Sequence, residues 1–284
     1  MHLTKILGTE PVVDAEEEAF VVFSQDIPSQ SLGFIDAHAS TLEVSVSGYD
    51  LVIHQSPGLL TSNRKEGTTG AVVWKITPLL STLLTSPTSF LTTSSLLSPH
   101  STVLELGAGV SGILALTLAP KVSRYIATDQ SYVLKLLRQN VAENLGVVFP
   151  QPKSARKKGK AGHGGQGDGL GGDARIEVKS LDWETDDVSQ CSAVDMVVAC
   201  DCIYNEALIE PLNTTCAALC KLRAEDETPT LCLIAQQLRS PDVFEAWLKS
   251  FVAKFEVWQV PGDMLGEGLG EGSGFVVHVG VVRR

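Results

Sequence analysis

The segment from residue 103 to 112, VLELGAGVSG, constrains the fold more than any other part of the chain. Its first residues are apolar and read as the end of a buried strand, and Gly107, Gly109 and Gly112 follow. Glycine lets a backbone turn sharply and come close to a ligand, and the free N–H groups at a helix start can receive anionic or polar groups. The segment therefore predicts a nucleotide-type cofactor site between a strand and a helix.

Strand-like and helix-like segments alternate after this turn. Short apolar strands are followed by amphipathic helices, such as the one that carries Val133, Leu137, Val141 and Leu145. This order is typical of an α/β fold with a doubly wound, mostly parallel sheet. The last two strands are joined by a glycine-rich loop and no helix, so we expect the last strand to be antiparallel. The seven predicted strands are residues 103–106, 124–130, 176–183, 194–201, 230–237, 255–260 and 274–284.

Two regions are expected, an N-terminal extension at 1–70 and a main domain at 71–284. From Thr41 apolar and polar residues alternate, and the turn at 47–50 is followed by another apolar run, which predicts a β-hairpin in the extension. Residues 150–173 are rich in glycine and lysine and poor in apolar side chains. They predict a flexible surface insertion in the main domain.

The charge balance limits the choice of partners. The 284 residues include 33 acidic and 22 basic side chains, and the formal net charge is −11. This negative charge disfavours binding to a nucleic-acid backbone and favours binding to a basic protein or peptide. Acidic side chains can also serve only to keep a protein soluble. The N-terminus has no signal-peptide pattern, and no apolar run reaches the length of a membrane span. We therefore expect a cytoplasmic protein that could also enter the nucleus, without a membrane or direct nucleic-acid partner, and we expect a monomer.

The six cysteines lie in apolar segments, which is typical of reduced thiols in a core. Cys200, Cys202, Cys216 and Cys220 could be imagined as a zinc site, but their spacing matches no standard finger. We therefore predict no metal.

The glycine turn admits two kinds of cofactor. The glycines fit G-x-G-x-x-G, and Asp129 lies where a dinucleotide fold places its ribose-binding acid, so a nicotinamide-dependent oxidoreductase is one interpretation. Three features point elsewhere: Glu105 precedes the turn, the acidic-aromatic pair Asp182-Trp183 ends the third strand, and the sheet finishes with an antiparallel pair. No Tyr-x-x-x-Lys or His/Asp hydride-transfer set is evident after the turn.

At these positions the chain resembles the seven-strand, Rossmann-like methyltransferases that depend on S-adenosylmethionine. More narrowly, it resembles the protein-lysine methyltransferases of non-histone proteins, and within them the fungal ribosomal lysine N-methyltransferase type. The order and spacing of the motifs carry the resemblance over most of residues 71–205. The matching motifs are VVWKITPLL at 72–80, LELGAGVSGI at 104–113, ATDQ at 127–130, LDW at 181–183 and ACDCIYN at 199–205.

The resemblance implies S-adenosylmethionine as cofactor and assigns residues to each part of it. The ribose hydroxyls would meet a carboxylate, the adenine a flat apolar surface with a polar edge, and the methionine end a backbone cradle and an acid. A small residue would leave room for the transferred methyl. In this order the residues are Asp129 for ribose, Asp182 and Trp183 for adenine, Gly107, Ala108, Gly109 and Glu105 for the methionine end, Ala199 beside the methyl and Trp74 closing over the cofactor.

The segment Asp201-Cys202-Ile203-Tyr204 resembles the family's acid-x-x-Tyr motif, which implies the acceptor site. A lysine has a reference pKa of about 10.4, so it must lose a proton before its nitrogen attacks. We expect Asp201 to bind and align the cation and not to act as a strong base, because an adjacent acid raises the pKa of the amine. Tyr204 would orient the nitrogen and pack on the aliphatic stem.

Structural alternatives stay open for several of these residues. Asp129 and Asp201 could instead cap the helices that follow them, and Trp183 and Tyr204 could simply be packed. The resemblance implies methyl transfer to a lysine of a cytosolic non-histone protein, with a large-subunit ribosomal protein as a candidate. A third interpretation is a non-catalytic module that keeps the cofactor fold and acts by binding a partner.

Overall fold

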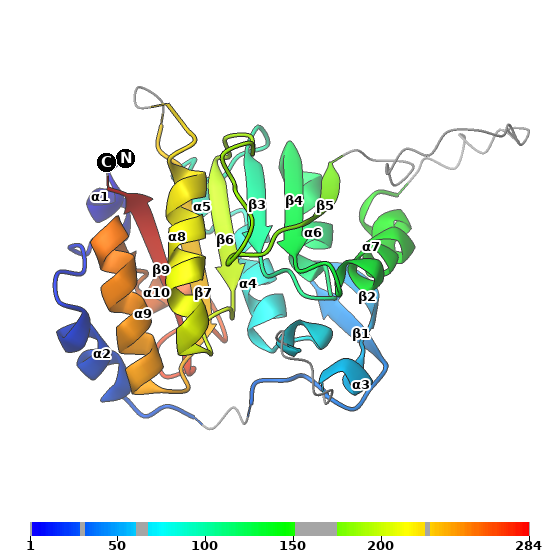
Figure 1. Ribbon diagram of the computed structural model, residues 1–284, viewed down its shortest axis with the longest axis horizontal. Coiled ribbons are helices and arrows are strands. Elements are labelled where there is room, and N and C mark those ends of the chain that lie inside the picture. The colour runs from blue at the N-terminus through cyan, green and yellow to red at the C-terminus, as the bar shows by residue number, and fades with distance from the viewer. Residues whose placement is uncertain (1, 29–31, 61–67, 151–174, 225–227, 284) are drawn as a thin grey trace, which may run out of the picture.

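Seven strands form one mixed sheet at the centre of the protein (Figure 1). They are β3 (Thr102–Leu106), β4 (Arg124–Asp129), β5 (Ile176–Ser180), β6 (Met196–Cys200), β7 (Leu231–Gln237), β8 (Phe255–Gln259) and β9 (Phe275–Val282). In the computed structural model, which describes residues 2–28, 32–60, 68–150, 175–224 and 228–283, their order is β5-β4-β3-β6-β7-β9-β8. The strands from β3 to β7 pair in parallel, whereas β9 is antiparallel to both β7 and β8. This confirms the predicted mostly parallel sheet with an antiparallel last strand.

The strand order reverses beside β3. β4 lies on one side of it and β6 on the other, so the helices that follow β3 and β6 cover opposite faces of the sheet. These helices are α6 (Ile113–Leu118) and α8 (Ile209–Cys220). Such a reversal opens a crevice beyond the carboxyl ends of the strands, where open α/β sheets bind ligands.

Helices on both faces of the sheet produce two apolar cores (Figure 1). The first contains buried side chains of α4 (Ile76–Thr85), α6 and α7 (Leu134–Val148), and the second those of α2 (Ala15–Phe23), α8 and α9 (Pro241–Lys254). Both faces of the strands are therefore apolar, as expected for a parallel sheet. The short elements are α1 (Leu3–Leu7), α3 (Pro57–Leu60), α5 (Phe90–Thr93), α10 (Gly262–Leu265) and 3₁₀ turns at Thr69–Ala71, Ala119–Lys121 and Glu206–Leu208.

The connection between β8 and β9 differs from the sequence-based expectation. The glycine-rich segment predicted a loop without a helix, but it contains the helical turn α10. Leu265 and Leu269 are both buried and anchor this connection to the first core. The chain then returns as β9 between β7 and β8, a position that the strand pattern did not specify.

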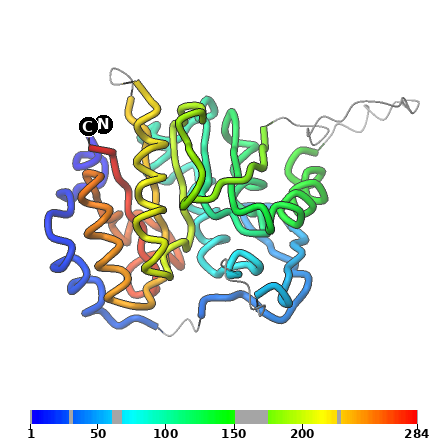
Figure 2. The backbone as a smooth tube through the Cα atoms, viewed as in Figure 1, coloured from blue at the N-terminus to red at the C-terminus, as the bar shows by residue number. Residues whose placement is uncertain are grey.

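The N-terminal region packs onto the same sheet and helices. The predicted hairpin is present as β1 (Thr41–Val46) and β2 (Tyr49–His54), which pair antiparallel. Residues 24–28 and 32–40, between α2 and the hairpin, lie along the edge at which the parallel strands end (Figure 2). The insertion predicted at 150–173 lies almost wholly outside the described residues, and the boundary at residue 70 stays a prediction. No helix within the described ranges has both the length and the apolar character needed to cross a lipid bilayer.

Two asparagine side chains of α7 hold the hairpin. The amide of Asn144 accepts from the N–H of Val52 at 3.0 Å and donates to its carbonyl at 2.9 Å. The amide of Asn140 does the same with His54, at 2.8 and 2.9 Å. Four helix residues rise about 6 Å and two strand residues about 6.6 Å, so the two amides match successive outward-facing residues of β2.

Candidate functional site

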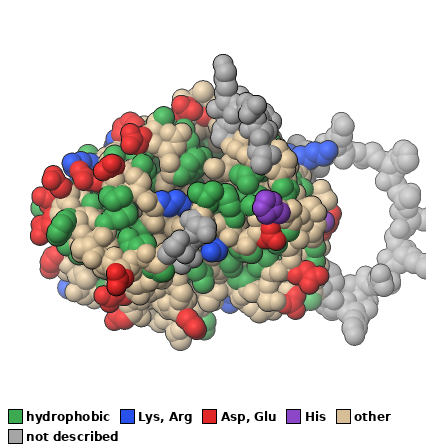
Figure 3. All heavy atoms as spheres, turned by 90° about the horizontal axis from the view of Figure 1, so that it is seen from below, with side chains coloured by type: hydrophobic (Ala, Val, Ile, Leu, Met, Phe, Trp, Pro, Cys, Tyr) green, Lys and Arg blue, Asp and Glu red, His purple; other side chains and the backbone are tan. Residues whose placement is uncertain are grey.

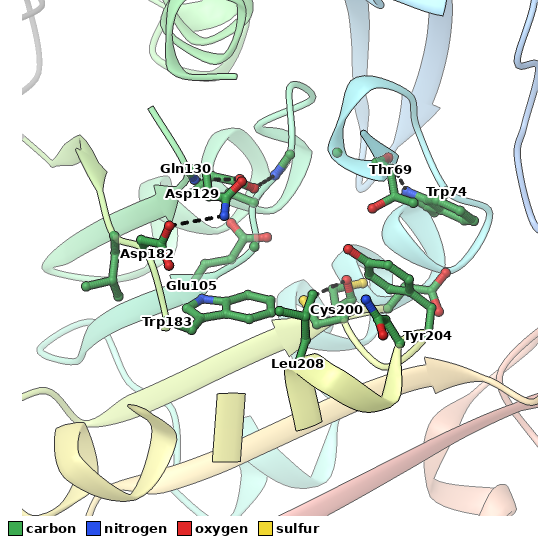
Figure 4. A pocket seen from close by; sticks show the side chains of 18 of the residues that line it. Thr69, Trp74, Glu105, Asp129, Gln130, Asp182, Trp183, Cys200, Tyr204 and Leu208 are labelled. Carbon is green, nitrogen blue, oxygen red and sulfur yellow. Dashed lines mark hydrogen bonds between the residues drawn. The ribbon is translucent and has the colours of Figure 1, made fainter. Parts of the chain in front are cut away.

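A cavity of about 450 Å³ lies at the carboxyl ends of β3, β4 and β6, in the expected crevice. Figure 4 shows Asp129, Asp182 and Trp183 on one side of it, and Trp74 and Tyr204 on the other. The cavity brings together ten of the eleven residues that the sequence predicted for the site. They are Trp74, Glu105, Gly107, Ala108, Gly109, Asp129, Asp182, Trp183, Asp201 and Tyr204.

The glycine turn is packed too closely for side chains. Gly107 has a φ of 71°, and a Cβ there would lie 2.6 Å from the Sγ of Cys202. Gly109 has a φ of 60°, and a Cβ there would lie 3.0 Å from the carbonyl oxygen of Gly70. Both the left-handed backbone and the close neighbours require glycine at these positions. The turn therefore presents bare backbone to the cavity, as predicted.

Glu105 is a buried carboxyl group that lines this cavity. The hydroxyl of Tyr125 donates a hydrogen bond to its Oε2 at 2.8 Å. Burial raises the pKa of Glu105 to about 8, the charge of Asp129 adds to the rise, and the bond from Tyr125 opposes it. A buried acid with this pKa is poised to ionise when a cation arrives beside it.

Asp129 ends β4 and joins the end of this strand to the glycine turn after β3. Its Oδ2 accepts the N–H of Gly109 at 2.7 Å, and its Oδ1 accepts the N–H of Gln130 at 2.7 Å. Burial raises its pKa to about 6, and the two N–H donors oppose that rise. The alternative role as a helix cap is wrong, because α7 begins only at Leu134 and is preceded by Val133 as its N-cap. Each carboxylate oxygen can accept a second hydrogen bond, so the group can still receive a ligand hydroxyl.

Asp182 and Trp183 lie in the turn after β5. The side chain of Gln130 donates to Asp182 Oδ2 at 3.2 Å, which links this turn to the end of β4. The indole of Trp183 is half-buried, and its ring would be 3.2 Å from a Cβ on Gly107. A flat ring therefore stands directly beside the glycine turn, and Gln130 is a cavity residue that the sequence analysis did not identify.

Ala199 does not line the cavity, contrary to the expectation. Side chains alternate between the two faces of a strand, and Ala199 is fully buried in the core against α8. Its neighbour Cys200 lines the cavity instead, with its thiol 3.9 Å from the hydroxyl of Thr77. Burial raises the pKa of this thiol well above its usual value, so Cys200 offers the cavity a neutral group.

The carboxylate of Asp201 already accepts three hydrogen bonds within the protein. Arg239 donates from Nη1 to Oδ1 at 2.7 Å and from Nη2 to Oδ2 at 2.6 Å, and the N–H of Gln237 donates to Oδ1 at 3.1 Å. The side chain of Asp201 is 1% exposed. The expected direct contact with a lysine ammonium therefore conflicts with the geometry, because this charge is neutralised by an arginine that the sequence analysis did not identify.

Tyr204 and Trp74 flank the open side of the cavity (Figure 4). Tyr204 is 37% exposed, and burial of the rest of its side chain raises the pKa of its hydroxyl. The indole N–H of Trp74 donates to the carbonyl of Thr69 at 3.1 Å. Thr69 thus holds Trp74, and it lines the cavity beside the two aromatic residues that the resemblance assigned to the acceptor and cofactor sides.

The groups that line the cavity fit S-adenosylmethionine. Two buried carboxyl groups suit an ammonium and ribose hydroxyls, an indole suits a purine, and the glycine turn brings the backbone to the cavity without a side chain in between. In the described part of the chain, no cluster of three or more histidine, cysteine or acidic side chains is arranged to hold a metal ion.

Comparison with known proteins identifies the family. The lysine methyltransferase family model matches residues 53–151 and 169–250. Ribosomal lysine N-methyltransferase 5 of Zygosaccharomyces rouxii is 31% identical over 232 residues, which are 74% of this chain and 72% of that protein. The enzyme of the same name from Vanderwaltozyma polyspora is 27% identical over 85% of this chain and 89% of its own length. A diaminohydroxyphosphoribosylamino-pyrimidine deaminase of Schizosaccharomyces pombe is 27% identical over 87% of this chain but only 53% of its own length. The chain therefore belongs to the lysine methyltransferase family, and it is an S-adenosylmethionine-dependent protein-lysine N-methyltransferase.

Proposed function

We propose that this enzyme methylates a lysine of a cytosolic non-histone protein, and that a basic, large-subunit ribosomal protein is the first candidate. The similar enzymes of Zygosaccharomyces rouxii and Vanderwaltozyma polyspora are named as ribosomal lysine methyltransferases, which supports this substrate class. The net charge of −11 favours a basic partner. Acidic side chains are spread around the rim of the face at which the parallel strands end (Figure 3).

The cofactor would lie across the glycine turn. S-adenosylmethionine supplies a methyl group that the positive sulfonium already activates. We assign Glu105 to the ammonium of its methionine end, because this acid is buried and is bonded by the hydroxyl of Tyr125 and not by a cationic side chain. Asp129 would accept the ribose hydroxyls, and Trp183 would cover the adenine. These roles agree with the positions of the three side chains in one cavity.

The acceptor lysine would enter past Tyr204 and Trp74. Its amine must be neutral to attack, and a site of low polarity lowers the pKa of an amine. The ion pair between Asp201 and Arg239 supports this requirement, because an unpaired carboxylate at the same place would hold the amine in its charged form. The hydroxyl of Tyr204 is the group that we assign to orienting the nitrogen, and solvent would accept the proton. Asp201 then acts by position and not by direct contact.

The observation that carries the proposal is one cavity that joins the buried acid of the cofactor side to an exposed tyrosine at its mouth. The test is transfer of labelled methyl from S-adenosylmethionine into separated cytosolic and ribosomal protein fractions, followed by chromatography of methylated lysine. We expect one dominant labelled ribosomal protein. Tyr204→Phe should lower the rate by about tenfold or more. Tyr49→Phe, in the hairpin, is the matched control and should not change it.

Two results would contradict this function. Label in a small molecule or RNA, with none in protein, would refute the substrate class. Label in protein that is confined to cytosolic, non-ribosomal bands would refute the ribosomal candidate. We also propose that the enzyme acts as a monomer in the cytoplasm, which light scattering of the purified chain and fractionation of cells that express it would test.

A further inference from the structure

Arg239, which follows β7, contacts three other segments of the chain, and two of them carry residues that line the cavity, Asp201 and Trp74. Its guanidinium binds both carboxylate oxygens of Asp201, a bidentate pairing that fixes direction as well as distance. Its Nη2 also donates to the carbonyl of Leu32 at 3.3 Å and to Oε1 of Gln237 at 3.0 Å. Its Cζ lies 5.1 Å from the ring centre of Trp74, within the range of a cation–π contact.

The pairing with Asp201 fixes the start of the segment that runs from Asp201 to Tyr204. Asp201 has a φ of 58°, a left-handed conformation that a non-glycine residue adopts only when its surroundings hold it there. Its N–H donates to the carbonyl of Ala235 at 2.7 Å, and its carboxylate is held from the other side by Arg239. The direction in which the chain leaves Asp201 decides where Tyr204 stands, three residues later.

The contact with Trp74 reaches the same side of the cavity by a second route. Trp74 donates to the carbonyl of Thr69 at 3.1 Å, and Thr69, Trp74 and Tyr204 all line one side of the cavity (Figure 4). Arg239 therefore holds this side through two segments, the one that leads from Asp201 to Tyr204 and the one that carries Thr69 and Trp74. Loss of the arginine contacts would release both segments without removing a group that lines the cavity.

The segment around Gly33 leaves space for the side chain of Arg239. Gly33 has a φ of 92°, and a Cβ there would lie 2.9 Å from Nη2 of Arg239 and 2.0 Å from Oε1 of Gln237. Only a residue without a side chain leaves this space free. The side chain of Arg239 is 22% exposed and that of Asp201 is 1% exposed, so the arginine shields the carboxylate from solvent.

We propose that Arg239 is the positioning residue of the acceptor site, which holds Asp201 and Trp74 in the arrangement that aims Tyr204 at the substrate nitrogen. This inference rests on the proposed lysine-transfer function and adds a residue to it. Arg239 does not touch the reacting atoms; it acts through the two residues it holds. Lysine at this position would keep the charge but lose the planar fork and the stacking face.

The test compares Arg239→Lys with Arg223→Lys in the full chain. Arg223 also pairs with an aspartate, Asp195, at 2.7 Å, but away from the cavity, so it controls for the loss of an arginine ion pair. We expect Arg239→Lys to lower the maximal rate of methyl transfer to a ribosomal protein fraction by between about tenfold and a hundredfold. Calorimetry should show that the affinity for S-adenosylhomocysteine falls much less than the rate, and the fluorescence of Trp74, isolated by subtraction of a Trp74→Phe variant, should shift. Arg223→Lys should change none of these.

Two further variants test the route of the effect. Asp201→Asn combined with Arg239→Lys should cost no more activity than the worse single change, because both act through one unit. Gly33→Ala should displace the arginine and reproduce the Arg239→Lys result, whereas Gly8→Ala, with a φ of 72° and open space around it, should not.

An unchanged maximal rate in Arg239→Lys, additive effects in the double variant, or a loss of cofactor affinity in parallel with the rate would overturn the inference. If the wild-type chain binds S-adenosylhomocysteine but labels no protein, the proposed function fails separately. The fluorescence of Trp74 still reports the positioning in that case, and emission that Arg239→Lys leaves unchanged overturns it.

Discussion

Glu105 makes cofactor binding depend on pH in a way that can be calculated. Burial raises its pKa to about 8, so the free protein holds this group protonated at neutral pH. The ammonium of the cofactor needs the ionised form, and ionisation costs about 1.4 kcal/mol at pH 7 and about 2.7 kcal/mol at pH 6. The affinity for S-adenosylhomocysteine should therefore fall about tenfold from pH 7 to pH 6.

The measurement is calorimetric titration with S-adenosylhomocysteine from pH 6 to 7.5 in two buffers of different ionisation enthalpy. The difference between the buffers gives the number of protons released, which we expect to be about one per bound ligand at pH 7. Glu105→Gln removes the titrating group and should abolish most of the pH dependence. A smaller slope near pH 6 should persist, because burial raises the pKa of Asp129 to about 6. Glu43→Gln, in the hairpin, is the control.

An affinity that is flat between pH 6 and 7.5, with no proton released, would refute this account of Glu105. It would mean that the carboxyl group is already ionised in the free protein, or that the ammonium binds elsewhere. A slope that persists unchanged in Glu105→Gln would assign the proton to another group.

Four other changes test the site and the fold. The pKa of Glu105 is raised from 4.5 to about 8, so between these pH values the folded chain keeps a proton that the unfolded chain loses, and folding becomes less favourable as the pH rises. Glu105→Gln removes this loss, so it should raise the melting temperature at pH 8 and leave it nearly unchanged at pH 4. Gly107→Ala should abolish cofactor binding in calorimetry, whereas Gly48→Ala, also left-handed but with open space around it, should not. Trp183→Leu should lower the affinity for S-adenosylhomocysteine by about tenfold if the indole covers the adenine, and an affinity equal to that of the wild type would exclude this role. Asn140→Ala should destabilise the chain by about 2 kcal/mol in urea unfolding, since it leaves buried backbone groups of the hairpin and of the glycine turn unpaired.

The sequence predicted those features that depend on local pattern. The glycine turn, the acids at strand ends and the order of strands and helices all follow from neighbouring residues, and parallel strands bring their carboxyl ends to one edge of the sheet. The glycines alone did not decide between a nicotinamide and a methyl-donor cofactor. That distinction came from the motifs around them, and membership of the family removes the oxidoreductase alternative.

The errors arose where the decisive contact is distant or where the pattern is uniform. β6 is apolar on both faces, so nothing in its sequence tells which of Ala199 and Cys200 faces the cavity. Arg239 meets Asp201 across 38 positions of the chain, and no motif marks it. The place of β9 between β7 and β8 depends on how the strand packs against its neighbours and not on its own composition.

The asparagines of α7 give the small hairpin a property that its two strands lack. An unpaired strand edge is a template on which another chain can add a strand, and the exposed side chain of Val52 would favour such growth. Asn140 and Asn144 occupy the outward N–H and C=O groups of alternate residues, so their side chains stand where the backbone of a third strand would lie. The helix thereby satisfies the hydrogen-bonding groups on the outer edge of β2, and aggregation through this edge would require both amides to be displaced.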